Sequence, residues 1–341
     1  MSTDDPIILP TALAWRAEGR RVALATVIQT WGSAPRPVGS QLVIDGSGNF
    51  LGSVSGGCVE GEVIAEVPEV LTSAKSKTLE FGVENDAAWK VGLTCGGTIR
   101  IFLEPLEALK REHDGVLSRI AGDIAARRKV ALITELTTGT RRIAHTPDDL
   151  GPELAPALVD AFLKGRSSVL EGSAGEIFIR IFNPTTRLIV IGAVHIAQPL
   201  VPMARALGWE VVIVDPREAF ATVERFRNTE IVQDWPEEAL AALGLDASTA
   251  VVVLSHDKKI DDPALIAALS SDAFYVGALG SKKTHAKRVE RLLAAGVPEA
   301  DIARIHAPIG LDLGALDAAE IALSIIAEIT ATQRGKDGAR K

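Results

Sequence analysis

Cysteine is scarce in this sequence, with Cys58 and Cys95 as the two copies among 341 residues. Two cysteines cannot form the disulfide framework of a small secreted scaffold, so we expect a protein of the reducing cytoplasm. Long apolar runs are lacking as well, because the most hydrophobic stretch, residues 188–207, is broken by a histidine, a glutamine and two prolines. We therefore expect no association with a membrane.

Positive charge is in deficit, since 36 lysines and arginines face 44 acidic residues and leave a net charge of −8. Nucleic-acid binders draw most of their affinity from lysine and arginine on phosphates, so we do not expect nucleic acid as a partner. Familiar catalytic motifs are missing too. The sequence has no H-E-x-x-H, G-x-S-x-G or Walker A motif, which argues against a zinc hydrolase, a serine hydrolase and a P-loop protein.

What is present is the composition of a globular protein, with 47% apolar and 23% charged residues. A chain of this length is typical of two domains. The best linker is Asn183–Thr186, because an apolar run starts directly after it. We therefore predict one domain over residues 1–184 and a second over 185–334, followed by a frayed tail over 335–341.

The first domain mixes hairpins with helices, which indicates an α+β fold. A turn at residues 45–49 joins two of its strands, and the stretch 137–152 is polar and rich in turn residues. Helices are expected over residues 11–19 and 59–70, and strands over 21–29, 41–45, 98–103, 129–136 and 176–182.

The second domain alternates short apolar strands with helices, the pattern of a parallel sheet that is covered on both faces. We therefore predict a Rossmann-like, doubly wound α/β fold. Its last helix starts after Asp317, with Glu320 completing a variant of the capping box. Strands are expected over residues 187–191, 210–214, 249–254 and 273–276.

The turn after the first of these strands lies where a doubly wound sheet binds its ligand. Gly192 suits the tight turn, but Val194 stands where a dinucleotide site has its second glycine, so we do not expect ordinary NAD(P) binding. His195 lies in the same turn. After the second strand, Asp215 and Arg217 either reach the rim of the ligand crevice or form a helix cap with salt bridges.

A second candidate site follows the fourth strand, where Gly277 and Gly280 precede the expected N-cap residue Ser281. Lys282 then lies in the first helical turn, where the helix dipole disfavours a cation unless an anion is near. Glycines, a helix N-terminus and ammonium groups together describe an anion site. The alternative is a solvated surface helix.

Both cysteines adjoin paired glycines, with Gly57 directly before Cys58 and Gly96 directly after Cys95. Paired glycines let a ligand approach the backbone closely. Thiolates in such turns can contact a soft metal such as molybdenum, carry a persulfide or react. The alternative is that both cysteines are small, buried apolar residues.

A rigid loop over residues 32–39 is the last candidate. Its prolines restrict the backbone, and its one cation is Arg36. Ser33 and Arg36 either bind an anionic ligand or belong to a plain turn between two strands.

Several of these segments form motifs that follow one another in a fixed order: GSAPRPVGS (32–40), GSVSGGCVEGEV (52–63), TCGGTIRIFLEP (94–105), IGAVHIA (191–197), VDPREAFATVERF (214–226), YVGALGSKKT (275–284) and PIGLDLGALDAAEIALSIIAEI (308–329). Together they resemble the XdhC/CoxI family, accessory proteins of molybdenum hydroxylases such as xanthine dehydrogenase and carbon monoxide dehydrogenase. The resemblance covers nearly the whole chain apart from residues 107–175. Val194 departs from the glycine that the family often has.

The resemblance implies an accessory protein and not an enzyme. Such a protein binds molybdenum cofactor, as molybdopterin or its dinucleotide form, supports its sulfuration by a cysteine desulfurase and aids its insertion into an apo molybdenum hydroxylase. We expect the phosphate or nucleotide end near residues 277–283 and the turn at Gly192, and the metal near Cys58 and Cys95. A homo-oligomer is a further expectation. Two alternatives stay open: an NAD(P)-dependent oxidoreductase, and a docking scaffold that holds no cofactor.

Overall fold

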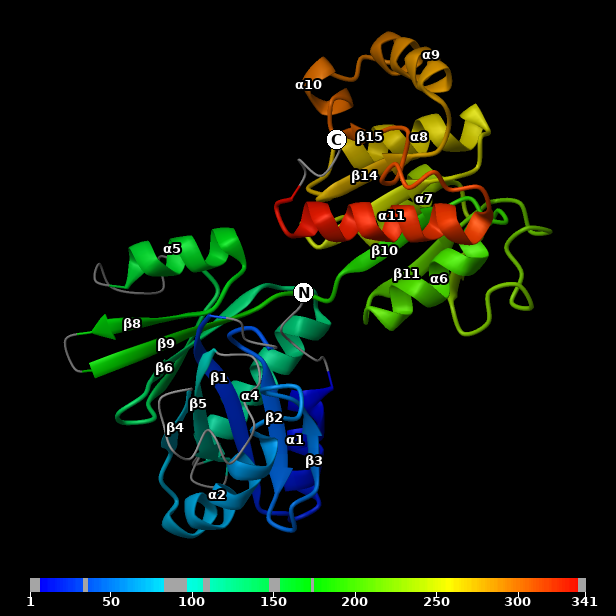
Figure 1. The fold of residues 1–341 in the computed structure, drawn as a ribbon. Coiled ribbons are helices and arrows are strands. Elements are labelled where there is room, and N and C mark those ends of the chain that lie inside the picture. Colours follow the sequence, from blue (N-terminus) through cyan, green and yellow to red (C-terminus); the bar gives the residue numbers. More distant parts are fainter. Residues whose placement is uncertain are drawn as a thin grey trace. The chain divides into compact units, whose positions relative to one another are not determined.

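The computed structural model describes residues 7–32, 36–82, 97–106, 111–146, 154–172 and 175–336, with only the backbone of 111–114 (Figure 1). The chain divides into two compact units, Ser2–Pro184 and Thr185–Lys341. Each unit has its own sheets and its own hydrophobic clusters. Among the described helices, none combines the length and the apolar character that crossing a membrane requires.

The first unit contains an antiparallel five-stranded sheet in the order β3-β2-β1-β5-β4. Its central strand, β1, is buried over most of its length, and helix α2 packs its valines on one face of the sheet. The elements are β1 (Val22–Trp31), β2 (Gln41–Asp45), β3 (Phe50–Gly52), α2 (Glu60–Ser73), β4 (Lys77–Phe81) and β5 (Thr98–Pro105).

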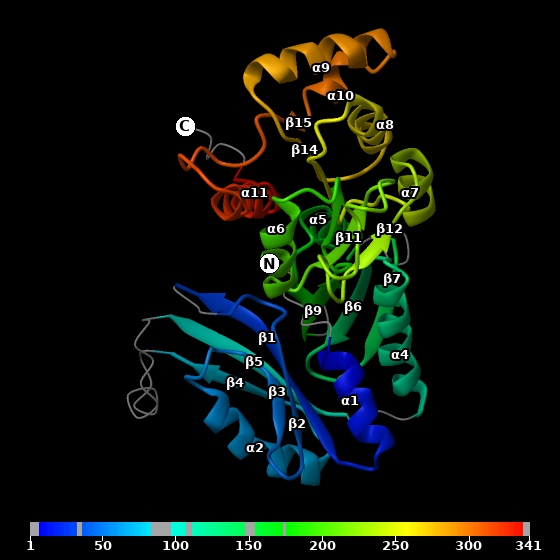
Figure 2. The same ribbon diagram turned by 90° about the vertical axis from the view of Figure 1, so that its right-hand side faces the viewer.

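A second antiparallel sheet of this unit has the order β7-β6-β9-β8. Helices α1 and α4 share a hydrophobic cluster with strands of both sheets (Figure 2), while α5 belongs to the cluster on the other face of the second sheet. The elements are α1 (Ile8–Ala17), α4 (Arg111–Ala125), β6 (Val130–Glu135), β7 (Arg141–Ala144), α5 (Ala155–Lys164), β8 (Ser168–Gly172) and β9 (Gly175–Phe182).

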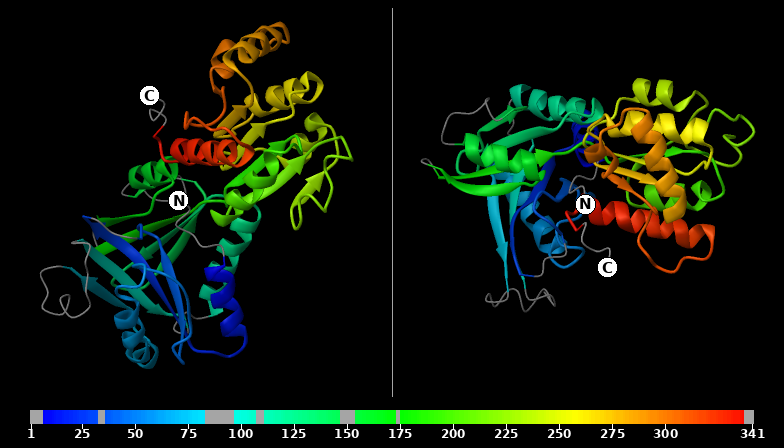
Figure 3. Two further views of the ribbon diagram at one scale, coloured as in Figure 1. Left: turned by 45° about the vertical axis from the view of Figure 1, so that its right-hand side comes forward. Right: turned by 90° about the horizontal axis from the view of Figure 1, so that it is seen from above.

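The second unit is a parallel six-stranded sheet in the order β12-β11-β10-β13-β14-β15. Helices α6 and α11 cover one face, and α7, α8, α9 and α10 contribute to the cluster on the other face (Figure 3). The elements are β10 (Arg187–Ile191), α6 (Ala197–Ala206), β11 (Glu210–Val214), β12 (Glu230–Val232), α7 (Pro236–Leu243), β13 (Thr249–Val253), α8 (Lys258–Leu269), β14 (Tyr275–Ala278), α9 (Lys282–Ala294), α10 (Glu299–Ile302), β15 (Ile305–His306) and α11 (Ala318–Gln333).

This strand order confirms the predicted Rossmann-like, doubly wound α/β fold, with an α+β unit before it. Strands β10 and β13 are fully buried because both faces of the sheet are covered, which explains their continuous apolar runs. One prediction is wrong in part: the polar stretch 137–152 contains β7. This short strand lies at the edge of its sheet, where polar side chains are tolerated.

Candidate functional site

The carboxyl edge of the parallel sheet brings the turn after β10 against the turn after β13. Gly192 has a φ of +101°, a conformation that favours glycine. A Cβ at this position would lie 2.9 Å from both the Cβ and the backbone nitrogen of Ser255. The two turns therefore meet at the point where the strand order reverses, which is the ligand crevice of doubly wound folds.

Asp215 lies at this edge, directly after β11, and is fully buried. Its Oδ2 accepts a hydrogen bond of 2.8 Å from the backbone N–H of Ala193, and Arg217 donates from Nε and Nη2 at 2.8 and 2.7 Å. Burial opposes ionisation, but these hydrogen bonds hold the pKa of Asp215 below its ordinary value. Both oxygens thus accept hydrogen bonds from the chain itself, and the carboxylate anchors the glycine turn.

The remaining predicted residues on this edge differ in their surroundings. His195 is exposed, with Nδ1 3.1 Å from Oε1 of Gln198. Gly277 is buried, and a Cβ there would lie within 2.7 Å of the Tyr275 ring, so this glycine permits close packing. Ser281 is the N-cap residue of α9 and accepts a hydrogen bond from the Thr284 N–H, as the sequence predicts. Gly280 has a φ of +130°, and Lys282 is exposed.

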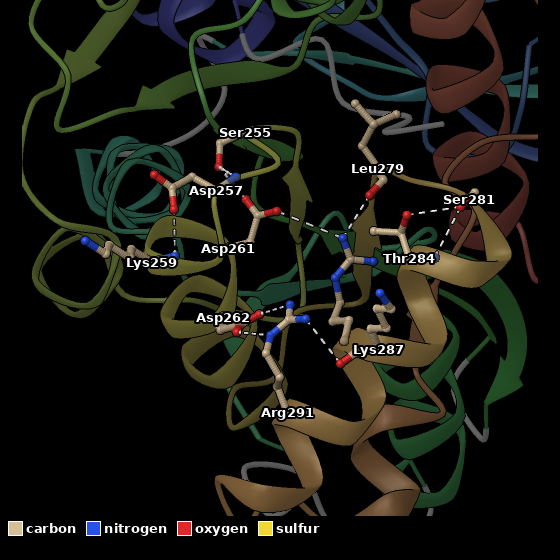
Figure 4. A network of polar contacts seen from close by, with 11 residues as sticks. Ser255, Asp257, Lys259, Asp261, Asp262, Leu279, Ser281, Thr284, Lys287 and Arg291 are labelled. Carbon is tan, nitrogen blue, oxygen red and sulfur yellow. Dashed lines mark hydrogen bonds and ion pairs between the residues drawn. The ribbon is translucent and has the colours of Figure 1, made fainter.

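A pocket of about 540 Å³ lies on the α8 and α9 side of the same edge (Figure 4). The start of α8 forms one wall, and one face of α9 forms the other. This set of residues was not predicted from the sequence. A signal was nevertheless present, since residues four apart on a helix share one face. The lining residues are Ser255, His256, Asp257, Lys258, Asp261, Thr284, Arg288 and Arg291.

Two charged side chains at this pocket are almost entirely buried. The side chains of Asp261 and Arg288 are 5% and 2% exposed, with Oδ2 and Nη2 4.0 Å apart. The hydroxyl of Ser255 donates to Asp261 at 2.5 Å, and Arg288 Nη2 donates to the carbonyl of Leu279 at 2.8 Å. Burial raises the pKa of Asp261 and lowers that of Arg288, so the buried environment disfavours the charged form of both side chains.

In the first unit, the loop before α2 is built around the carboxylate of Glu60. This side chain accepts six hydrogen bonds, from two serine hydroxyls and four backbone N–H groups of residues 53–57. One of these donors is the N–H of Gly57, at 2.9 Å, where φ is +112°. Burial opposes ionisation, but the hydroxyl and backbone hydrogen bonds lower the pKa of Glu60 from 4.5 to about 2. The ionised carboxylate of Glu60 therefore stabilises the conformation of the loop.

Cys58 follows this loop and is partly buried against the cluster under α2. Arg36 Nε donates to the carbonyl of Ser53 at 3.3 Å, so the structure brings Arg36, Gly57 and Cys58 to one loop. Ser33, Cys95 and Gly96 lie outside the described residues. Among the side chains that are described, no three histidine, cysteine or carboxylate groups are placed to hold a metal ion.

Family models match both units. Residues 188–329 match a model described as the XdhC Rossmann domain. Residues 15–82 match a model described as the XdhC and CoxI family. Each match contains motifs that carried the resemblance in the sequence.

Two curated relatives and one solved structure are similar over nearly the whole chain. The molybdenum cofactor insertion chaperone PaoD of Escherichia coli (strain K12) is 28% identical over 98% of this chain and 90% of its own length. A probable xanthine dehydrogenase subunit of Bacillus subtilis (strain 168) is 27% identical over 91% of this chain and 93% of its own length. A crystal structure described as a xanthine dehydrogenase from Bacillus halodurans has a TM-score of 0.76 at 26% identity, covering 100% of this chain and 98% of that one.

Proposed function

Since this chain belongs to the XdhC and CoxI family, we propose that it is an accessory protein that binds molybdenum cofactor and supports its sulfuration and insertion into a molybdenum hydroxylase. The membership confirms the resemblance of the sequence motifs. One observation carries the functional proposal: the similarity to the Escherichia coli insertion chaperone extends over both units of the chain. The protein then acts as a carrier and not as an enzyme with turnover.

The carboxyl edge of the Rossmann sheet is the proposed place for the phosphate or nucleotide end of the cofactor. Gly192 lets the turn after β10 pack against Ser255 there, Gly280 has a φ of +130°, and Ser281 starts a long helix whose first turn carries Lys282. A helix N-terminus with nearby ammonium groups favours negative charge. The cofactor is cargo in this proposal, and the chain's own residues orient it and shield it from water.

Sulfur chemistry is assigned to the cysteines. Cys58 follows a loop that Glu60 holds in a defined shape, which suits a thiol that must meet a reactive partner. We propose that Cys58 and Cys95 contact the molybdenum or carry sulfur that a cysteine desulfurase supplies. The cytoplasm as compartment, an apo hydroxylase as recipient and a homo-oligomer belong to the same proposal.

The test is what the protein carries when it is purified from cells that make molybdenum cofactor. We expect mass spectrometry to find a molybdopterin species and metal analysis to find molybdenum. The loaded protein should then activate an apo hydroxylase. A protein that carries no pterin, and that adds nothing to activation, would refute the proposal in favour of a docking scaffold.

The cysteine assignment needs its own variants. We expect Cys58→Ala or Cys95→Ala to weaken equilibrium binding of molybdenum cofactor, with Ser270→Ala, an exposed residue after α8, as the control. Undiminished affinity in both cysteine variants would remove the thiols as ligands. The carrier function would still be tested by the analysis of what the purified protein carries.

A further inference from the structure

The pocket between α8 and α9 holds little uncompensated positive charge. Asp257 caps α8 by accepting the Lys259 N–H at 2.9 Å. Arg291 donates to both oxygens of Asp262, at 2.6 and 2.8 Å. Asp261 adds a second carboxylate to the lining. When Asp262 is counted, three carboxylates face the three cations Lys258, Arg288 and Arg291, so the pocket has no net positive charge to favour a phosphate.

The buried pair Asp261 and Arg288 has polar atoms that make no hydrogen bond to the described part of the chain. Oδ1 of Asp261 takes the Ser255 hydroxyl, while Oδ2 is 4.0 Å from Arg288 Nη2, beyond hydrogen-bond distance. Nε and Nη1 of Arg288 make no hydrogen bond to the described part of the chain. Unpaired buried donors are destabilising, which is why native proteins rarely keep them. What remains is one acceptor, Oδ2 of Asp261, and two donors on the guanidinium whose Nη2 lies 4.0 Å from it.

We propose that this pocket binds a 2-amino-4-oxopyrimidine ring, the hydrogen-bonding half of a pterin. Such a ring is neutral and carries N–H donors beside a carbonyl acceptor on one edge. The donors match the carboxylate of Asp261 (Figure 4), and the carbonyl matches the guanidinium of Arg288, whose Nη2 lies 4.0 Å from that carboxylate. The pocket volume of about 540 Å³ has room for the ring.

This inference rests on the proposed function and deepens it, because molybdenum cofactor is built on a pterin. It also places the pterin ring beside the proposed site of the phosphate end. The pocket lies at the carboxyl ends of β13 and β14, next to Gly280 and Ser281, which are proposed to face the phosphate end. Guanine has the same hydrogen-bonding edge, so the experiment must separate the two sources.

Titration of the full-length protein with free pterin, followed by pterin fluorescence or calorimetry, tests the assignment. We expect lumazine, whose 2-oxo group replaces the 2-amino donor, to bind about tenfold more weakly or worse, because it sets an acceptor against Asp261. Guanosine should bind more weakly than pterin. Inorganic phosphate should not compete.

The matched variants are Asp261→Asn and Asp272→Asn. We expect Asp261→Asn to weaken pterin binding about tenfold or more and to reduce the discrimination against lumazine. Asp272 is exposed in the turn before β14, at the opposite edge of the sheet, so its variant should bind like wild type. If Asp261→Asn does not fold, the comparison of pterin with lumazine on wild type decides alone.

Equal binding of pterin and lumazine, or an unchanged affinity in folded Asp261→Asn, would overturn the inference. Tighter binding of guanosine would overturn it in favour of a guanine nucleotide, and competition by phosphate in favour of an anion site. A wild type that carries molybdenum cofactor without binding free pterin would refute this pocket alone. Selective pterin binding by a protein that never carries the cofactor would refute the carrier function alone.

Discussion

At the scale of single residues, Glu60 shows how a loop can be ordered from within. Paired glycines at residues 56–57 suggest backbone N–H groups that await a ligand, but both N–H groups donate to the Glu60 carboxylate. Sequence reasoning missed this role because a glutamate in the first turn of a helix is ordinary. The signal that could have found it is the spacing, since Glu60 stands only three residues after Gly57.

The lowered pKa of Glu60 makes stability depend on pH. Because the pKa falls from 4.5 to about 2 on folding, the contribution is complete above about pH 4.5 and is lost as the pH falls toward 2. A shift of this size corresponds to about 3 kcal/mol. We expect Glu60→Gln to lose stability at pH 7 and to flatten this part of the acid-unfolding curve of the first unit.

The control for this prediction is Glu62→Gln, which alters an exposed carboxylate in the same turn of α2. It should unfold like wild type at every pH. Denaturant unfolding between pH 2 and 7 provides the measurement. Parallel curves for wild type and Glu60→Gln would contradict the role of this carboxylate.

Gly192 supports a second prediction at this scale. An alanine there must adopt a φ of +101° and place its Cβ 2.9 Å from Ser255, so we expect Gly192→Ala to destabilise the second unit by about 3 kcal/mol or more. Gly208→Ala is the control, because φ is +75° but no described heavy atom lies within 4 Å of the added Cβ. It should lose about 1–2 kcal/mol. Equal losses in denaturant unfolding would disprove the close approach.

At the scale of elements, the strands that were not identified from the sequence lie at sheet edges. Strands β4, β7, β8, β12 and β15 are each the outermost strand on one side of a sheet. Their polar and partly exposed residues weaken the apolar alternation by which strands are recognised. The central strands were predicted within two residues, because burial on both faces leaves a continuous apolar run.

The turn from β10 to α6 carries an element-scale prediction about nicotinamide cofactors. Val194 occupies the second glycine position, and Asp215 is engaged by Arg217 and Ala193. We therefore expect NADH and NADPH to leave the thermal unfolding midpoint unchanged. A bound cofactor at 100 times its dissociation constant would add about 2.7 kcal/mol, which a thermal-shift assay detects. A midpoint that rises with NADH or NADPH concentration would restore the oxidoreductase alternative.

At the scale of the whole molecule, each hydrophobic cluster of the described residues lies within one unit. Two clusters fall within residues 188–329, and four fall within 8–182. Gln333 of α11 also donates to Thr186 at 2.7 Å, which ties the start of the second unit to its last helix. A core of this kind is the property of a domain that folds alone.

We therefore expect residues 185–341, produced as a fragment, to unfold cooperatively and to keep α/β circular dichroism. If the proposed pterin pocket is right, the folded fragment also binds free pterin, since the lining residues all belong to it. Residues 187–341 serve as the comparison, because this fragment lacks Thr186 and should be less stable by about 1 kcal/mol. A fragment 185–341 without a cooperative transition would contradict the independence of its core.

The sequence by itself determined the class of the central strands and the family, because apolar periodicity and motif order are local properties of the chain. It also located Gly192, Asp215 and Ser281 at strand and helix ends. Only the tertiary structure decided that Asp215 binds its own turn and that Asp261 meets Arg288 at 4.0 Å. Those partners come from separate elements. Which polar atoms have a hydrogen-bond partner, and which have none, depends on how folding brings these elements together.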